Sequence, residues 1–246
     1  MHGRLLGMVV FCGSVLLAPT AALAEPGFAV SLGETGAEQT STAVRVILLL
    51  TVLSFAPAIL LATTSFLRVI IVLSFVRSAL GTQGMPPTQV LTGLALFLTL
   101  AVMAPTGRQV YAEGLRPYLD SELGAEAAFD AGSKPLRTFM LRQTREADIG
   151  LFFEMNHLDR PARPEDVPMH LLVPAFITSE LRTGFEMGFM LLLPFLLVDL
   201  VVSSVLMGLG MVMLPPTVVS LPVKVLLFVV VDGWHLLVGS LVRSFG

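Results

Sequence analysis

Two aspartates lie within long apolar runs, Asp199 in LLVDLV and Asp232 in VVVDGW. Paired carboxylates that share a proton cleave peptides in aspartic proteases, so an intramembrane protease is one interpretation. Such proteases carry a GxGD motif at one aspartate, and the nearest match here, at residues 208–211, has methionine in place of the acid. Because an unpaired charge is costly inside a membrane, we favour a second interpretation, in which both aspartates pair with Lys224 and with arginines between helices.

The spacing of three polar residues near the end of the sequence predicts a buried polar stripe. At about 100° per residue, Lys224 and His235 fall on nearly the same face of one continuous helix, and Asp232 stands about 80° away. Asp232 can therefore reach a neighbouring helix. The alternative interpretation of His235 is an interfacial residue whose ring reaches polar surroundings.

Other chemistry has little support in the sequence. Glu154-x-x-His157 resembles half of a di-iron motif whose second copy is missing, and His157 and His170 lie in a Pro-rich stretch. The chain contains no GxSxG, P-loop, GxGxxG or CxxC motif, and its only cysteine is Cys12. We therefore expect no enzyme activity, no metal and no cofactor.

The composition places the chain among membrane proteins. Of its 246 residues, 54% are hydrophobic and 13% are charged, and the mean hydropathy is +0.83. Soluble globular domains carry about 25% charged residues, so this chain has roughly half the usual share. The net charge of -3 comes from charges of mixed sign, which argues against a nucleic acid as a partner.

The first 24 residues have the pattern of a secretory signal peptide. Arg4 supplies a positive charge, residues 5–17 are apolar, and the small-x-small site at residues 22–24 predicts cleavage between Ala24 and Glu25. An uncleaved first membrane helix is the alternative, which the short apolar run disfavours. Cleavage leaves residues 25–43 as the N-terminal segment of the mature chain.

Charged residues divide the rest of the chain into three segments. Nine Lys/Arg and twelve Asp/Glu, 21 of the 33 charged residues, lie between Arg108 and Arg182, and the flanking segments carry few. We therefore expect an all-α protein with membrane-associated helical hairpins at residues 44–106 and 184–246. A polar, mostly helical domain at residues 107–183 is inserted between them.

The first apolar segment contains more than one helical piece. A spanning helix needs about 20 apolar residues, and the piece after Arg68 is shorter than that. We therefore expect residues 45–77 to form one long kinked helix or a broken pair, with the kink at Pro57. The turn GTQGMPP follows at residues 81–87.

The membrane topology follows from the ends of these segments. A cleaved signal peptide leaves Glu25 on the outer side of the membrane. The turn of the first hairpin, which begins at Arg77, then lies on the inner side, in agreement with the positive-inside rule. This arrangement places the N-terminus and residues 107–183 on the periplasmic side and residues 207–216 on the inner side.

The connection between the last two apolar runs, GLGMVMLPP, is apolar and rich in sulfur where turns usually contain Asn, Asp or Ser. Methionine is unbranched and adaptable, and it is used on surfaces that re-pack. Several copies around an axis could therefore close a hole and yet yield to a passing chain. A membrane-dipping turn between two helices is the alternative. The loop at residues 207–216 offers Met207, Met211 and Met213 for such a seal, with Gly208, Gly210, Pro215 and Pro216 as hinges.

Four long motifs follow one another along the chain, at residues 62–83 (ATTSFLRVIIVLSFVRSALGTQ), 172–189 (LVPAFITSELRTGFEMGF), 193–216 (LPFLLVDLVVSSVLMGLGMVMLPP) and 221–242 (LPVKVLLFVVVDGWHLLVGSLV). Together they resemble the FliP family of flagellar biosynthetic proteins, which supplies the main export-gate subunit of flagellar type III secretion. The resemblance extends over about residues 44–245. Virulence-type secretion systems contain similar subunits that usually lack a cleaved signal peptide, so the signal peptide here favours the flagellar branch.

The resemblance implies a structural role in a pore. Subunits of this family assemble with FliQ-like and FliR-like subunits into a helically arranged, conical pore in the inner membrane at the flagellar basal body. FlhB-like and FlhA-like export components are further implied partners, and the cargo is unfolded rod, hook and filament subunits. The apparent membrane helices of the family are bent hairpins in contact with lipid and with other copies, and its members bind no nucleotide.

The resemblance also implies roles for single residues. It places the gasket of the closed pore at Met211 and Met213, with Met207 just before it. Val212 stands between them, where the family often has a third methionine. In a tightly packed oligomer, five charged residues become buried partners between helices or between subunits: Glu180, Glu186, Asp199, Lys224 and Asp232.

Two other functions remain as alternatives at this point. An intramembrane aspartyl protease would use Asp199 and Asp232 for catalysis. An ion-coupled transporter would bind a small solute near the same two acids, but the sequence has no evident internal repeat of the kind such transporters carry.

Overall fold

The computed structural model describes residues 37–82, 84–211 and 213–246. Its contacts divide the chain into two units, Met1–Thr51 and Val52–Gly246. The expected signal peptide and its cleavage site at Ala24 and Glu25 lie outside the described residues. What the structure describes of the first unit is the beginning of helix α2, and the features below belong to the second unit.

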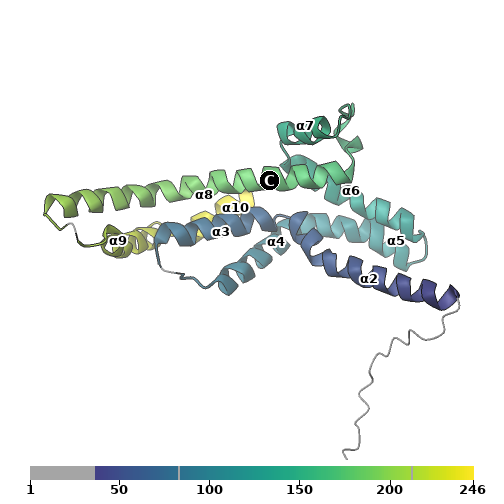
Figure 1. Cartoon of the computed structure of the whole chain (residues 1–246), viewed down its shortest axis with the longest axis horizontal. Coiled ribbons are helices and arrows are strands. Elements are labelled where there is room, and N and C mark those ends of the chain that lie inside the picture. The colour runs from purple at the N-terminus through teal and green to yellow at the C-terminus, as the bar shows by residue number, and fades with distance from the viewer. Residues whose placement is uncertain (1–36, 83, 212) are drawn as a thin grey trace, which may run out of the picture. The chain divides into compact units, whose positions relative to one another are not determined.

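The described residues form helices joined by turns, with no β-strand, which confirms the all-α expectation. In chain order (Figure 1) the elements are α2 (Ala37–Ala62), α3 (Phe66–Leu80), α4 (Thr88–Val110), the π-helix η1 (Tyr111–Leu115), α5 (Arg116–Leu119), α6 (Ala125–Gln143), α7 (Glu146–Met155), the 3-10 turn η2 (Pro164–Asp166), α8 (Met169–Gly208), α9 (Pro216–Val230) and α10 (Gly233–Arg243).

In the part of the chain that the structure describes, three helices are long and apolar enough to cross a membrane. They are Val44–Ala62 of α2, the stretch Thr88–Leu119 that runs from α4 to α5, and the 40-residue α8. The helices α9 and α10 pass the same test as a pair, bent by 64° at the break between them. At about 1.5 Å per residue, α8 is about 60 Å long, roughly twice the thickness of a bilayer's hydrocarbon core.

The first apolar segment is a broken pair of helices, and its interruption lies after the proline expected to cause it. Pro57 is inside α2, and the chain leaves the helix at residues 63–65. There the Thr63 hydroxyl donates to the carbonyl of Ile59 at 2.9 Å, and the Thr64 hydroxyl accepts from the amide of Phe66 at 3.4 Å. Threonine hydroxyls compete in this way with backbone partners, so the break falls at the threonines.

The three segments defined by charge do not begin and end where helices do. The helix α4 runs through the expected boundary at residues 106–107, and α8 runs through the boundary at residues 183–184. The polar insertion therefore shares its first and last helices with the apolar hairpins. Its own interior is a small core between α6, α7 and α8, made of Met140, Phe153, Val167, Leu171, Leu172 and Phe176.

The main core surrounds α3, which has 15 residues and is too short to span a bilayer alone. Its side chains Val69, Val72, Leu73 and Val76 are at most 2% exposed. An apolar helix that is covered on most sides belongs inside a protein rather than against lipid. The other buried members of this core come from α4, α8, α9 and α10: Leu91, Ala95, Phe195, Phe228, Leu237 and Leu241.

Two glycines of α8 allow α3 to approach it closely. A Cβ atom at Gly188 would lie 2.4 Å from the ring of Phe75, and one at Gly184 would lie 3.1 Å from Ile71. The side chains of α3 thus occupy the space that larger residues of α8 would need. Because Gly184 and Gly188 are four residues apart on one helix face, they form a GxxxG-type contact, which brings helices together in membranes.

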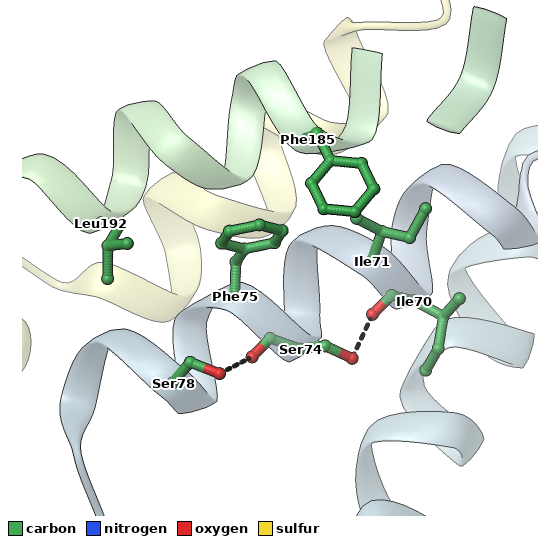
Figure 2. Close-up of a pocket in the computed structure, with 7 residues that line it drawn as sticks. All are labelled: Ile70, Ile71, Ser74, Phe75, Ser78, Phe185 and Leu192. Carbon is green, nitrogen blue, oxygen red and sulfur yellow. Dashed lines mark hydrogen bonds between the residues drawn. The ribbon is translucent and has the colours of Figure 1, made fainter. Parts of the chain in front are cut away.

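Beside this contact, α3 and α8 leave an open apolar groove of about 310 Å³, which Figure 2 shows. The rings of Phe75 and Phe185 meet edge-on in it, with centroids 5.4 Å apart. The hydroxyls of Ser74 and Ser78 donate to the carbonyls of Ile70 and Ser74, at 2.7 and 3.0 Å. These serines satisfy their donors within α3, so the groove presents an apolar surface.

The last apolar run bends between α9 and α10. Asp232 precedes α10 with a positive φ of 51°, a backbone conformation that L-residues other than Asn and Asp rarely adopt. A Cβ atom at Gly233 would lie 2.3 Å from the ring of Phe228, and that ring also meets Trp234 edge-on at 5.3 Å. The bend is therefore closely packed on its inner side.

This bend contradicts the expected polar stripe. Lys224 lies on α9 and His235 lies on α10, so the two residues do not share the face of one continuous helix. The prediction was wrong because it extrapolated a helical period through Asp232, where the backbone turns left-handed. His235 is exposed in the single chain.

Replacing Gly188 with alanine is expected to destabilise the protein by about 1–3 kcal/mol, because the Phe75 ring has to move to admit the new methyl group. Thermal unfolding of the detergent-solubilised protein, followed by circular dichroism, measures the change. Gly93→Ala in α4 is the matched control, since its new Cβ meets no atom within 4 Å. Equal melting temperatures for the two variants would contradict the close contact.

Candidate functional site

The most deeply buried ion pair joins α3 to α8. Arg68 and Glu180 are 112 residues apart in the sequence, and their side chains are 3% and 0% exposed. Arg68 donates from Nε to Glu180 Oε2 at 2.9 Å and from Nη2 to the other carboxylate oxygen, Oε1. This two-pronged geometry is the strongest that a guanidinium and a carboxylate can form.

The remaining donors of Arg68 hold the end of the chain and the end of α6. Nη1 donates to the carbonyl of Ser244 at 2.9 Å and to its hydroxyl at 3.1 Å, and Nη2 donates to Gln143 Oε1 at 3.0 Å. The guanidinium carbon lies 4.0 Å from the centre of the Phe245 ring. All five N–H groups of Arg68 are therefore used, and one side chain joins α3, α6, α8 and the C-terminal residues.

Sequence reasoning missed Arg68 as the partner of Glu180. The available signal was its position, because Arg68 is the only charged residue between Arg45 and Arg77 in an apolar segment. A charge in such a segment needs a partner. The sequence does not state which acid is that partner, because the two residues meet only when α3 lies along α8.

The second pair closes the hairpin of α8 and α9. Lys224 Nζ lies 2.6 Å from Asp199 Oδ2, and the hydroxyl of Ser220 donates to Asp199 Oδ1 at 2.5 Å. Ser220 and Lys224 are one helical turn apart on α9, so both reach the same carboxylate on α8. The exposed fractions of the Lys224 and Asp199 side chains are 6% and 25%. Asp199 is thus bound by a cation and a hydroxyl.

Two other acids named from the sequence are exposed. The Glu186 side chain is 52% exposed and bridges Arg145 and Arg182, at 2.6 and 3.0 Å. In the single chain Glu186 therefore lies at the surface, where it already has two arginine partners, Arg182 on α8 itself and Arg145 before α7. Asp232 is also exposed, and within residues 37–246, apart from the undescribed 83 and 212, its carboxylate has no ion pair or hydrogen bond.

The two aspartates considered for protease chemistry do not form a carboxylate pair. Asp199 is engaged by Lys224 and Ser220, whereas Asp232 lies beyond the far end of α9. A shared proton requires two carboxylates in direct contact. The described residues also contain no group of three or more His, Cys, Asp or Glu side chains that could hold a metal ion.

The methionine-rich loop is a tight turn with exposed apolar side chains. After α8 ends at Gly208, the amide of Met211 donates to the carbonyl of Leu206 at 2.9 Å, and Gly210 has a positive φ of 75°. Met213 is 99% exposed and Met211 is 44% exposed. The turn therefore presents sulfur-bearing side chains outward, which is the opposite of a packed core.

Residues that were expected as hinges flank this turn. Gly208 and Gly210 have open space where a Cβ atom would be, and the φ of Gly210 is one that glycine adopts without strain. Pro215 and Pro216 begin α9, Pro216 as its first helical residue, where proline is favoured. Met207, in the last turn of α8, is 61% exposed, and Val212 lies outside the described residues.

A family model described as the FliP family matches residues 49–241. This chain belongs to the FliP family. The match extends over both ion pairs and the methionine-rich loop. Ser244 and Phe245, which contact Arg68, lie just beyond it.

Curated relatives agree with this membership of the FliP family. The chain is 50% identical over 233 residues to a protein of Pectobacterium carotovorum subsp. carotovorum, covering 95% of this chain and 90% of the relative. It is 51% identical over 208 residues to a protein of Bacillus subtilis, covering 85% of this chain and 94% of the relative. It is 48% identical over 227 residues to a protein of Caulobacter vibrioides, covering 92% of this chain and 85% of the relative. All three are named flagellar biosynthetic protein FliP. The resemblance found in the sequence is confirmed.

Glu180→Gln is expected to lower the free energy of unfolding of this FliP-family chain by about 3–5 kcal/mol, because it leaves the Arg68 charge buried without a counter-charge. Thermal or denaturant unfolding in detergent measures the effect. Glu186→Gln makes the same chemical change on the same helix at an exposed site and is expected to leave the melting temperature near that of the wild type. Two variants that melt alike would contradict the importance of burial.

Proposed function

We propose that this chain is a pore-forming core subunit of the flagellar type III protein export gate. In that role it conducts unfolded rod, hook and filament subunits across the inner membrane and is needed for flagellum assembly. The observation that carries the proposal is the exposed methionine turn at the tip of an apolar hairpin in a chain of the FliP family. The names of the relatives favour the flagellar system over the equivalent subunit of a virulence-type system.

The length and surface of α8 support assembly into an oligomer. At about 60 Å the helix is roughly twice as long as the hydrocarbon core of a bilayer is thick, so lipid tails can cover only about half of it. Large apolar side chains are nevertheless exposed along it in the single chain, including Phe189, Leu197 and Leu200, which are 53%, 63% and 68% exposed. Other copies of this chain and FliQ-like and FliR-like subunits cover these faces, with lipid outside.

The gasket of the closed pore consists of Met211 and Met213, with Met207 beside them. Their unbranched side chains re-pack against those of neighbouring copies, which closes the channel to ions and water. Gly208, Gly210, Pro215 and Pro216 act as the hinges that let the loop move aside for a passing chain. Support for this role comes from the outward position of Met213 and from the open space around both glycines.

The charged residues contribute to assembly rather than to catalysis. Glu180, Asp199 and Lys224 hold the helices of one subunit in the shape that packs against the next. Glu186 and Asp232, which are exposed in the single chain, remain available for contacts with other subunits. The absence of a carboxylate pair at Asp199 argues against the protease alternative, and each of its oxygens already has a partner, which leaves little for a transported solute.

The proposed surroundings follow from the topology. The subunit lies in the inner membrane at the flagellar basal body, with its N-terminus and residues 107–183 on the periplasmic side. The methionine-rich loop then lies on the inner side of the membrane, beside the FlhB-like and FlhA-like export components. Unfolded flagellar subunits enter at that side and pass the gasket.

The gasket is tested by replacing Met211 and Met213 with glycine. We expect the complex to form at normal size, whereas cells that express it become permeable to small ions and solutes, because glycine leaves the narrow point open. Native electrophoresis measures assembly, and dye or ion uptake measures leakage. Met190→Gly, at an exposed methionine in the middle of α8, is the control. An assembled but equally tight double variant would remove the gasket assignment.

Lys224→Ala is expected to prevent assembly of the complex, because it leaves Asp199 charged and without a cation in an apolar hairpin. Size-exclusion chromatography after co-expression with the FliQ-like and FliR-like subunits measures this. The chain has one other lysine, the exposed Lys134, so Lys134→Ala is a matched control. Adding Asp199→Asn to Lys224→Ala should restore part of the complex. A normal-sized Lys224→Ala complex would contradict the proposed pairing role.

A further inference from the structure

Asp232 is an acid whose charge the described chain does not neutralise. It lies at the break between α9 and α10, two helices that are apolar enough to cross a membrane as a pair. Its carboxylate is exposed, and it neither caps α10 nor contacts a cation of the described residues. A lone charge in apolar surroundings is costly, so such a residue normally has a partner.

The bend itself does not explain why this residue is charged. The positive φ of Asp232 is available to Asn and to glycine at least as easily as to Asp. The bend is fixed by the contact of Gly233 with the Phe228 ring and by the edge-on contact of that ring with Trp234. A neutral residue at position 232 could therefore form the same turn, and the charge requires a separate explanation.

Arg77 is a cation of the apolar segments that has no acid partner among the described residues. It lies in the last turn of α3, is only partly exposed, and donates from Nη1 to the neutral hydroxyl of Thr88 at 2.9 Å. No acid of the described residues forms a salt bridge with it. Arg68 and Lys224, by contrast, are occupied by Glu180 and Asp199.

The packing along α8 places Arg77 and Asp232 at nearly the same level. On α3, Phe75 packs on Gly188 of α8, and Arg77 follows Phe75 by two residues in the same direction along α8. On α9, Phe228 packs on Phe195, with ring centroids 6.4 Å apart, and Asp232 follows it by one turn in the opposite direction. Both therefore lie near residues 190–191 of α8, yet they do not pair within one chain.

We propose that Asp232 of one subunit forms an ion pair with Arg77 of the neighbouring copy in the assembled pore. Because the two charges do not pair within one chain, a heterologous contact, in which each copy contributes a different surface, would bring Asp232 of one copy to Arg77 of the next. This inference rests on the proposed function, because it requires several copies around one channel. It places Asp232 in a contact between subunits, and it locates that contact near residues 190–191 of α8.

Two neutral variants test the role of the charge. Asp232→Asn and Asp232→Gly both permit the left-handed turn, and each is expected to lower the yield of full-size complex about tenfold or more, because Arg77 then lacks its partner. Arg77→Gln should have the same effect. The double variant Asp232→Asn with Arg77→Gln should recover much of the complex, since neither charge is left unpaired. Normal assembly of Asp232→Asn would overturn the proposal.

A thiol cross-link between differently tagged copies tests the partner. The sequence has one cysteine, Cys12, which is replaced by serine so that only the introduced thiols remain. One copy carries Asp232→Cys, the other carries Arg77→Cys, and both are co-expressed with the FliQ-like and FliR-like subunits and treated with a short bis-maleimide, because an Arg–Asp pair holds its Cβ atoms farther apart than the about 3.5–4.5 Å of a disulfide. A covalent dimer that bears both tags is expected, whereas Lys134→Cys in place of Arg77→Cys should give none.

Two results distinguish a wrong ion pair from a wrong function. If the wild-type chain forms the full-size complex but no dimer with both tags appears, the Asp232–Arg77 pair is wrong and the export-gate function is unaffected. If the wild-type chain forms no oligomer with its partners, the proposed function and the pair both fail.

Discussion

A charge inside apolar surroundings has to meet an opposite charge or a full set of hydrogen-bond partners, and this constraint arranges the helices of the protein. Arg68 shows it most clearly. Its guanidinium uses all five donors, on Glu180, Gln143 and Ser244, and its face lies against Phe245. Four parts of the chain that are far apart in sequence are thereby held at one point.

Close backbone contact reinforces the same arrangement. Gly184 and Gly188 let the short helix α3 lie directly on α8. This contact places Arg68 of α3 opposite Glu180 of α8. Further along α8, Lys224 and Asp199 fix α9 in the same way. The result is a subunit with firmly positioned helices, and the groove beside Phe75 and the long apolar faces of α8 remain open at its surface.

The methionine turn contrasts with these fixed regions. It contains no ion pair among its described residues, its glycines have open space around them, and Met213 is almost completely exposed. A gate needs both properties in one subunit. In the proposed pore, the rigid part keeps neighbouring copies in register around the channel, and the adaptable part changes shape when a chain passes. The buried charges supply the first, and the unbranched sulfur-bearing side chains supply the second.

The sequence by itself determined the helical class, the long apolar helices, the position of the methionine turn and the family, because these depend on local composition and on motifs that are continuous along the chain. Tertiary structure decided which charges meet. Arg68 pairs with Glu180, which is 112 residues away in the sequence, and Glu186 is exposed in the single chain. The backbone turn at Asp232 also places Lys224 and His235 on different helices, so the expected polar stripe does not form. Helical periodicity describes one straight segment, whereas the choice of a partner depends on where other segments pack.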